Sequence, residues 1–208
     1  LYRESRSFFS NEINLISTTD DPLQWLFGIY QYQENADQPG QLQYLRDEPL
    51  ADSYLDPVLG PVGNPDRYLQ YFRNTSLFNA YGVYGQVDYD FNDQIKGTLG
   101  LRWSKDTKES REEGFLGCYI ICGVDYYNFS RDAFSSVPDT SFDERGFAVR
   151  RLRGSWEATT GTAGVEYRPF DDTMIFAKYS RGYKAGGFNN LGFGAEPYTA
   201  PETVDAIE

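Results

Sequence analysis

Histidine is absent from this 208-residue sequence, which also has only two cysteines and one methionine. Without histidine, Ser-His and Cys-His catalytic pairs are impossible, and a Cys/His zinc site has no complete ligand set. The adjacent carboxylates Asp171-Asp172 and Glu112-Glu113 would point to opposite faces of a strand, so neither forms an acid-base pair by itself. We therefore expect a protein that is not an enzyme, with no catalytic residues, no metal site and no cofactor.

Long apolar runs are also missing. No stretch approaches the roughly 18 consecutive apolar residues of a transmembrane helix, which excludes a helical membrane protein. A transmembrane β-barrel is not excluded, because its strands alternate lipid-facing and lumen-facing residues. The aromatic content is 17%, and the interfacial girdles of a barrel use such residues. A soluble β-sandwich with a tyrosine-rich surface fits the composition equally well.

Basic residues are outnumbered: 31 acidic and 19 basic side chains give a net charge of -12. Binding to nucleic acid requires clustered Lys and Arg against the phosphates. We therefore expect no nucleic-acid partner.

The two cysteines, Cys118 and Cys122, lie four residues apart in a polar, irregular segment. A disulfide that staples a loop in an oxidising compartment is one interpretation of this pair. Two buried free thiols would have the same sequence pattern.

Alternating segments joined by tight polar turns are what the sequence does contain. The turns are Thr19–Pro22, Phe91–Gln94 and Phe170–Thr173. Between residues 94 and 104, Ile95, Leu99, Leu101 and Trp103 share one parity, while the other parity is mostly polar, which specifies a strand. The segments extend for roughly 11 to 17 residues, longer than the usual 5 to 6 of soluble proteins. Such lengths favour a membrane-crossing barrel.

Some residues interrupt this alternation. In the first strand pair these are Leu26, Tyr30 and Tyr32, and near the third turn they are Met174 and Phe176. We expect the last two to plug the rim of the sheet.

Two long connections, approximately Asn35 to Leu77 and Lys108 to Gly154, are rich in Asp, Pro, Gly, Ser and Tyr, and are expected to be irregular. Within the second, the candidate ligand-binding residues are two tyrosines and three nearby arginines: Tyr126, Tyr127, Arg150, Arg151 and Arg153. Arginines can clamp an anion by bidentate hydrogen bonds, and tyrosines can stack on its rings. The alternative is that these arginines are solvated and pair with Asp143 and Glu144.

The ends of the chain indicate a fragment. It begins at Leu1 without a secretory signal, and residues 201–208 alternate with no turn or cap to end them. We expect the segment to have been cut within a strand.

Several of these segments carry a family resemblance. The runs Asn79–Tyr89, Leu99–Asp106, Tyr179–Asn189 and Pro201–Glu208 occur in an order that resembles the barrel of TonB-dependent outer-membrane receptors. The run Tyr-Lys-Ala-Gly-Gly-Phe-Asn at residues 183–189 is the most specific of them.

The resemblance implies an all-β fold: an antiparallel transmembrane β-barrel, here an incomplete curved sheet of about seven long strands with short periplasmic turns and long extracellular loops. Residues 1–208 would be part of the barrel domain, with the plug domain and the C-terminal end of the barrel absent. About seven strands cannot close the 22-strand barrel of that family. The fragment alone is therefore not expected to transport a nutrient.

The resemblance further implies a receptor in the outer membrane of a Gram-negative bacterium. It would take up a scarce nutrient such as a ferric siderophore, and the TonB protein would energise it through the missing plug region. The expected partners are outer-membrane lipid, TonB and the nutrient. Two alternatives remain: a passive porin-type barrel and a soluble all-β glycan-binding module.

Overall fold

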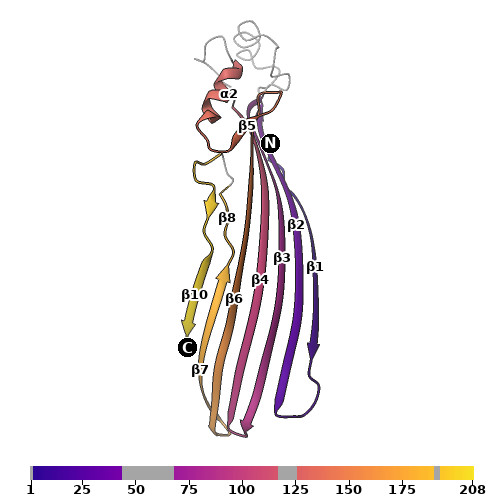
Figure 1. The fold of residues 1–208 in the computed structure, drawn as a ribbon, viewed down its shortest axis with the longest axis vertical. Coiled ribbons are helices and arrows are strands. Elements are labelled where there is room, and N and C mark those ends of the chain that lie inside the picture. Colours follow the sequence, from indigo (N-terminus) through magenta and orange to yellow (C-terminus); the bar gives the residue numbers. More distant parts are fainter. Residues whose placement is uncertain (1, 44–67, 117–125, 190–192) are drawn as a thin grey trace.

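A computed structural model describes residues 2–43, 68–116, 126–189 and 193–208, which form a tall, curved antiparallel sheet (Figure 1). Its main strands are β1 (Ser5–Ile16), β2 (Leu23–Gln43), β3 (Tyr68–Asn92), β4 (Ile95–Leu116), β6 (Ala148–Phe170), β7 (Thr173–Lys184) and β10 (Glu202–Ile207). Each of these seven strands pairs with the next one named, so that the order across the sheet is β1-β2-β3-β4-β6-β7-β10. The expected all-β fold with about seven strands is confirmed, as an open segment of a barrel.

Smaller elements lie at one end of this sheet. The short strand β5 (Thr140–Phe142) pairs with β6, and the helix α2 (Tyr126–Ser135) precedes it. A separate two-stranded ladder joins β8 (Gly187–Phe188) to β9 (Tyr198–Thr199). None of the helical residues that the structure describes forms a segment long and apolar enough to cross a membrane.

The three tight turns all lie on the opposite rim, at the bottom of Figure 1. The side-chain oxygen of Asn92 accepts hydrogen bonds from the backbone N–H groups of Gln94 and Ile95, both at 2.9 Å, which closes the turn between β3 and β4. In the first turn, Gln24 Nε2 donates to the carbonyl oxygens of Thr19 and Asp21, each at 2.7 Å. These local bonds explain why short polar sequences suffice to reverse the chain there.

The two faces of the sheet differ sharply over the half near the tight turns. Registered residues of neighbouring strands point to the same side, so pairs such as Ile29 with Val83, and Val83 with Trp103, form one apolar surface. These side chains are exposed, Leu101 by 59%, because no part of the described protein covers them. On β4 the apolar surface extends from Ile95 to Trp103, about the 9 to 11 residues that a membrane-crossing strand needs. We call this surface the lipid band and its side of the sheet the outward face; the opposite side is the lumen face.

The expected bounds of the two long connections, Asn35 to Leu77 and Lys108 to Gly154, are wrong, because described residues at both ends of each range belong to the sheet. β2 continues to Gln43, β3 starts at Tyr68, β4 continues to Leu116 and β6 starts at Ala148. The ladder persists beyond the lipid band because cross-strand polar pairs replace apolar ones, and such pairs leave no apolar alternation in the sequence.

Two small clusters of buried residues stabilise this extended end. Phe115 and Phe147 stack with ring centroids 5.0 Å apart on the outward face, and Tyr71 packs against them. On the lumen face Phe134, Ala148 and Phe193 are buried together. The sheet therefore has apolar cores only near its extended end within the described residues.

Candidate functional site

The lumen face carries a polar network that includes Arg102. The guanidinium of Arg102 lies 5.6 Å from the ring centroids of both Tyr30 and Tyr84. These three residues come from β4, β2 and β3, so the cation–π contacts depend on the register of three strands. The Tyr84 hydroxyl in turn contacts Glu12 and lies 2.6 Å from the Asn14 side-chain oxygen. This polar network crosses four neighbouring strands.

Lys108 connects the lumen face to the segment that follows β7. Its ammonium donates a hydrogen bond to the Gly186 carbonyl oxygen at 2.8 Å and lies over the rings of Phe78 (5.3 Å) and Trp156 (5.9 Å). The Trp156 ring also contacts Phe188, with centroids 6.0 Å apart. Residues 186–188 therefore lie against the lumen side of β4 and β6.

Between Arg102 and this segment there is a hollow of about 350 Å³. Its lining includes Arg102, Asp106, Thr160 and Tyr183. The Tyr183 hydroxyl is buried and has no hydrogen-bond partner among the described residues. The hollow thus brings a cation, a carboxylate and a buried hydroxyl together.

Arg150 and Glu112 form a buried ion pair on the lumen face, directly opposite each other in register on β6 and β4. Arg150 Nη1 also donates to the Gly194 carbonyl oxygen at 2.7 Å, and its guanidinium lies 5.3 Å from the Phe193 ring centroid. Phe193 packs on Phe134 of α2 at 4.7 Å. Arg150 therefore joins two strands, a helix and a distant segment of the chain.

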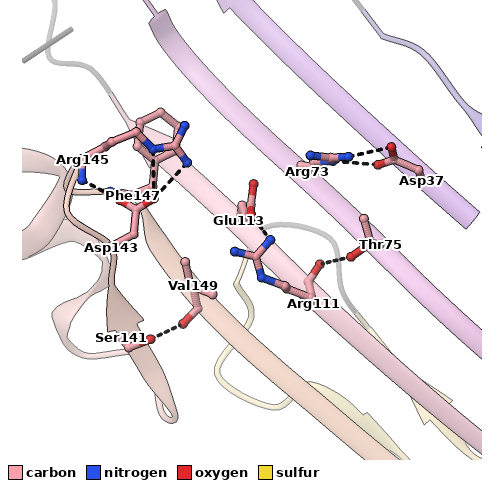
Figure 2. A network of polar contacts seen from close by, with 10 residues as sticks. All are labelled: Asp37, Arg73, Thr75, Arg111, Glu113, Ser141, Asp143, Arg145, Phe147 and Val149. Carbon is pink, nitrogen blue, oxygen red and sulfur yellow. Dashed lines mark hydrogen bonds and ion pairs between the residues drawn. The ribbon is translucent and has the colours of Figure 1, made fainter.

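The outward face above the lipid band has its own polar network (Figure 2). Arg73 donates two hydrogen bonds to the Asp37 carboxylate, at 2.8 and 2.9 Å. The hydrogen bonds from Arg73 hold the pKa of Asp37 below its ordinary value. Arg111 pairs with Glu113 on the same face. The pair of Arg73 and Asp37 joins β3 to β2, whereas Arg111 and Glu113 balance each other's charge within β4.

The structure separates the three arginines that the sequence placed together. Arg150 lies on the lumen face, buried with Glu112, whereas Arg151 is exposed on the outward face. Arg153 is on the outward face with Arg151 and pairs with Glu109 at 3.2 Å. Asp143 pairs instead with Arg145 at 2.9 Å.

The pairing of these arginines with Asp143 and Glu144 is therefore wrong for Arg150 and Arg153. The other sequence candidates lie where the structure describes no side chain. Tyr126 and Tyr127 begin α2 (Tyr126–Ser135), while Cys118 and Cys122 lie outside the described residues. Ligand binding by these tyrosines and arginines, and the disulfide, stay predictions.

Residues that the sequence did not offer as binding candidates form most of the lumen-face network, notably Tyr30, Arg102, Lys108 and Trp156. The sequence signal for these residues was the alternation within each strand. Tyr30, for example, breaks the apolar alternation because it lies on the polar lumen face. Which of these side chains meet depends on register, which a single strand does not reveal.

Comparisons with known proteins agree with this arrangement. A family model described as "TonB dependent receptor-like, beta-barrel" matches residues 2–208. The crystal structure of the ferric yersiniabactin uptake receptor FyuA from Yersinia pestis is similar over 99% of this chain, with a TM-score of 0.66 and 12% sequence identity. The match covers 25% of the FyuA chain, so the present chain spans about a quarter of that protein. Among curated proteins, no match was found.

Proposed function

Because the chain belongs to the TonB-dependent receptor-like β-barrel family, we propose that it forms consecutive strands in the wall of an outer-membrane receptor that takes up a scarce nutrient. The family consists of receptors and transporters of the Gram-negative outer membrane and not of enzymes. Residues 1–208 are assigned to the barrel domain, with a plug domain and further strands supplied by the rest of the receptor. The tight turns are assigned to the periplasmic side.

The division of the sheet into two faces supports this function best. One face carries the lipid band, while the other carries Arg102, Tyr84 and Glu12 at the same level. In a barrel wall the first contacts hydrocarbon and the second lines the lumen. A soluble glycan-binding module has no use for an exposed apolar band of this extent, because it would promote aggregation in water.

The nutrient that we propose is a ferric siderophore or similar iron complex, moved with energy supplied by TonB through the plug. The fold similarity to an uptake receptor for ferric yersiniabactin supports the class of cargo by analogy only. The lumen-face groups are compatible with it, since aromatic rings and cations can hold a polar, ring-bearing solute.

Uptake of radiolabelled ferric siderophores by the complete receptor that carries this segment tests the proposal. We expect uptake in iron-starved Gram-negative cells, loss of uptake in the same cells without TonB, and a heat-modifiable band in the outer-membrane fraction. Uptake that continues without TonB would support a passive porin instead. A receptor that is absent from the outer membrane would overturn the proposal.

A further inference from the structure

The ladder between β6 and β7 stops before either strand ends. Its last pair at the extended end is Gly161 with Arg181, although β6 begins at Ala148 and β7 continues to Lys184. The short strand β5 pairs only with residues 148–150 of β6. Among the described residues, the stretch 151–160 therefore has no ladder partner on this side of β6. Such a free edge leaves backbone N–H and C=O groups without strand partners.

The segment that could fill this edge lies on the lumen face instead. We call residues 182–188 the strap; they follow the last ladder pair and diverge from β6 (Figure 1). The strap is held on the lumen face by the hydrogen bond from Lys108 to the Gly186 carbonyl and by the packing of Phe188 on Trp156. Its first three residues stay paired with β10, so the strap moves as part of a hairpin.

The strap has the length and the side chains that the free edge requires. If the register of the existing ladder continued, the strap would pair with residues 154–160 of β6. Trp156 would then lie opposite Gly186, and Gly154 opposite Phe188. The indole and phenyl rings would each face a glycine, and no two like charges would be opposed. The sequence is therefore compatible with a longer ladder than the one observed.

Tyr183 of the strap is poorly accommodated on the lumen face. It lines the hollow beside Asp106, and its hydroxyl is buried without a hydrogen-bond partner among the described residues, which is costly. In the continued register Tyr183 would lie opposite Thr159, in the same outward-facing row as Trp103. That row is the upper border of the lipid band, where a tyrosine ring contacts apolar groups while its hydroxyl reaches water.

We propose that the strap has two positions: the lumen position seen here, and a ladder position in which it pairs along the free edge of β6. Gly182, directly after the last ladder pair, is the hinge, because a residue without Cβ accepts the change in backbone angles. The lumen position narrows the path of the cargo and the ladder position clears it. The inference rests on the proposed function, since it assigns the strap to the regulation of that path.

Disulfide trapping in the complete receptor tests the ladder position. Glu157 and Ala185 would be direct partners on the outward face, so Glu157→Cys with Ala185→Cys should form a disulfide when an oxidant is added. The lumen position does not allow this bond, because the Glu157 side chain points to the other face of the sheet. Mass spectrometry of the linked peptides separates the bond from any that Cys118 or Cys122 forms.

The matched control pair is Arg153→Cys with Ala185→Cys. Arg153 shares the outward face with Glu157 but lies four residues away, about 13 Å along the strand. We expect the in-register pair to form at least about five times as much disulfide as this control, because a bond requires Cα atoms within about 7 Å. A heat-modifiable band checks that every variant is folded.

A further substitution tests whether the two positions exchange. Lys108→Met removes the hydrogen bond that holds the strap in the lumen position, so it should raise the rate of in-register trapping about fivefold. Lys105→Met, on the outward face of the same strand, is the control and should leave the rate unchanged.

Uptake of radiolabelled ferric siderophores, measured for the in-register pair before and after reduction of the disulfide, tests the regulatory role. The trapped receptor should take up at least as much as the reduced one. Equal trapping of the two cysteine pairs, or a rate that Lys108→Met does not change, would overturn the two positions. Uptake that is lost on trapping and restored by reduction would overturn the assigned role. Trapping as expected without uptake in either state would support the two positions and contradict only the proposed function.

Discussion

Arg150 Nε donates a hydrogen bond to Glu112 Oε2 at 2.5 Å, and both side chains are almost completely buried, with exposures of 0% and 3%. Glu112 Oε1 and Arg150 Nη2 have no hydrogen-bond partner in the described structure. The pair is thus only partly satisfied, and its contribution depends on both charges being present.

Glu112→Ala should destabilise the extended end of the sheet because it leaves Arg150 buried without its counterion. The expected loss is about 3–5 kcal/mol. Hydrogen exchange in the complete receptor would show it as faster exchange at residues 148–153. The matched control is Glu109→Ala, whose exposed pair with Arg153 should contribute less than about 1 kcal/mol. Equal effects of the two substitutions would contradict the buried-pair interpretation.

The bond between Asp37 and Arg73 should make this end of the sheet sensitive to acid. The pKa of Asp37 is lowered in the folded protein, so its stabilisation is fully present above the unfolded pKa of about 3.9 and is lost as the pH falls through the lower folded value. The difference in urea midpoint between wild type and Asp37→Asn measures it. That difference should be present at neutral pH and vanish in acid; a constant difference would refute the linkage.

Substitutions on β4 distinguish its two faces within the lipid band. Leu101→Arg places a charge against hydrocarbon and should destabilise the barrel by roughly 2–4 kcal/mol. Thr98→Arg, on the lumen face of the same strand, should be tolerated. The fraction of heat-modifiable receptor in the outer membrane reports both. If the second substitution blocked assembly as strongly as the first, our assignment of the faces would be wrong.

Lys108→Met should release the segment that lies on the lumen face, since it removes the hydrogen bond to the Gly186 carbonyl, worth about 1 kcal/mol. A spin label at Asn189 should become more mobile in the electron paramagnetic resonance spectrum. Lys105→Met, on the outward face of the same strand, is the control and should leave the spectrum unchanged. A label that is equally mobile in all three proteins would show that Lys108 does not hold the segment.

The sequence predicted which face of the sheet a residue lies on far better than it predicted which residues are its cross-strand neighbours. Alternation assigned Leu99 and Trp103 to one side and Arg102 to the other, and the structure agrees because parity is fixed within a strand. The approach of Arg102 to Tyr30 depends on the register of β2, β3 and β4, which no single segment specifies.

The sequence did not predict the strand extensions or the burial of Arg150, for two different physical reasons. The strand extensions past the lipid band are mostly polar and lack a regular apolar alternation, so their composition resembles that of loops. The burial of Arg150 depends on Phe193 and Gly194, which are more than forty residues away along the chain. The opposite orientations of Arg150 and Arg151 follow from parity, but only once β6 is known to start at Ala148.

The continuation of the ladder beyond the lipid band has a mechanical consequence. The connections between β2 and β3, and between β4 and β6, start from paired strands that project well past the membrane surface. Because ladder hydrogen bonds resist bending, these stems act as stiff levers. A load applied to a connection would be transmitted down the strands into the wall, whereas a connection attached at the membrane surface would absorb it locally.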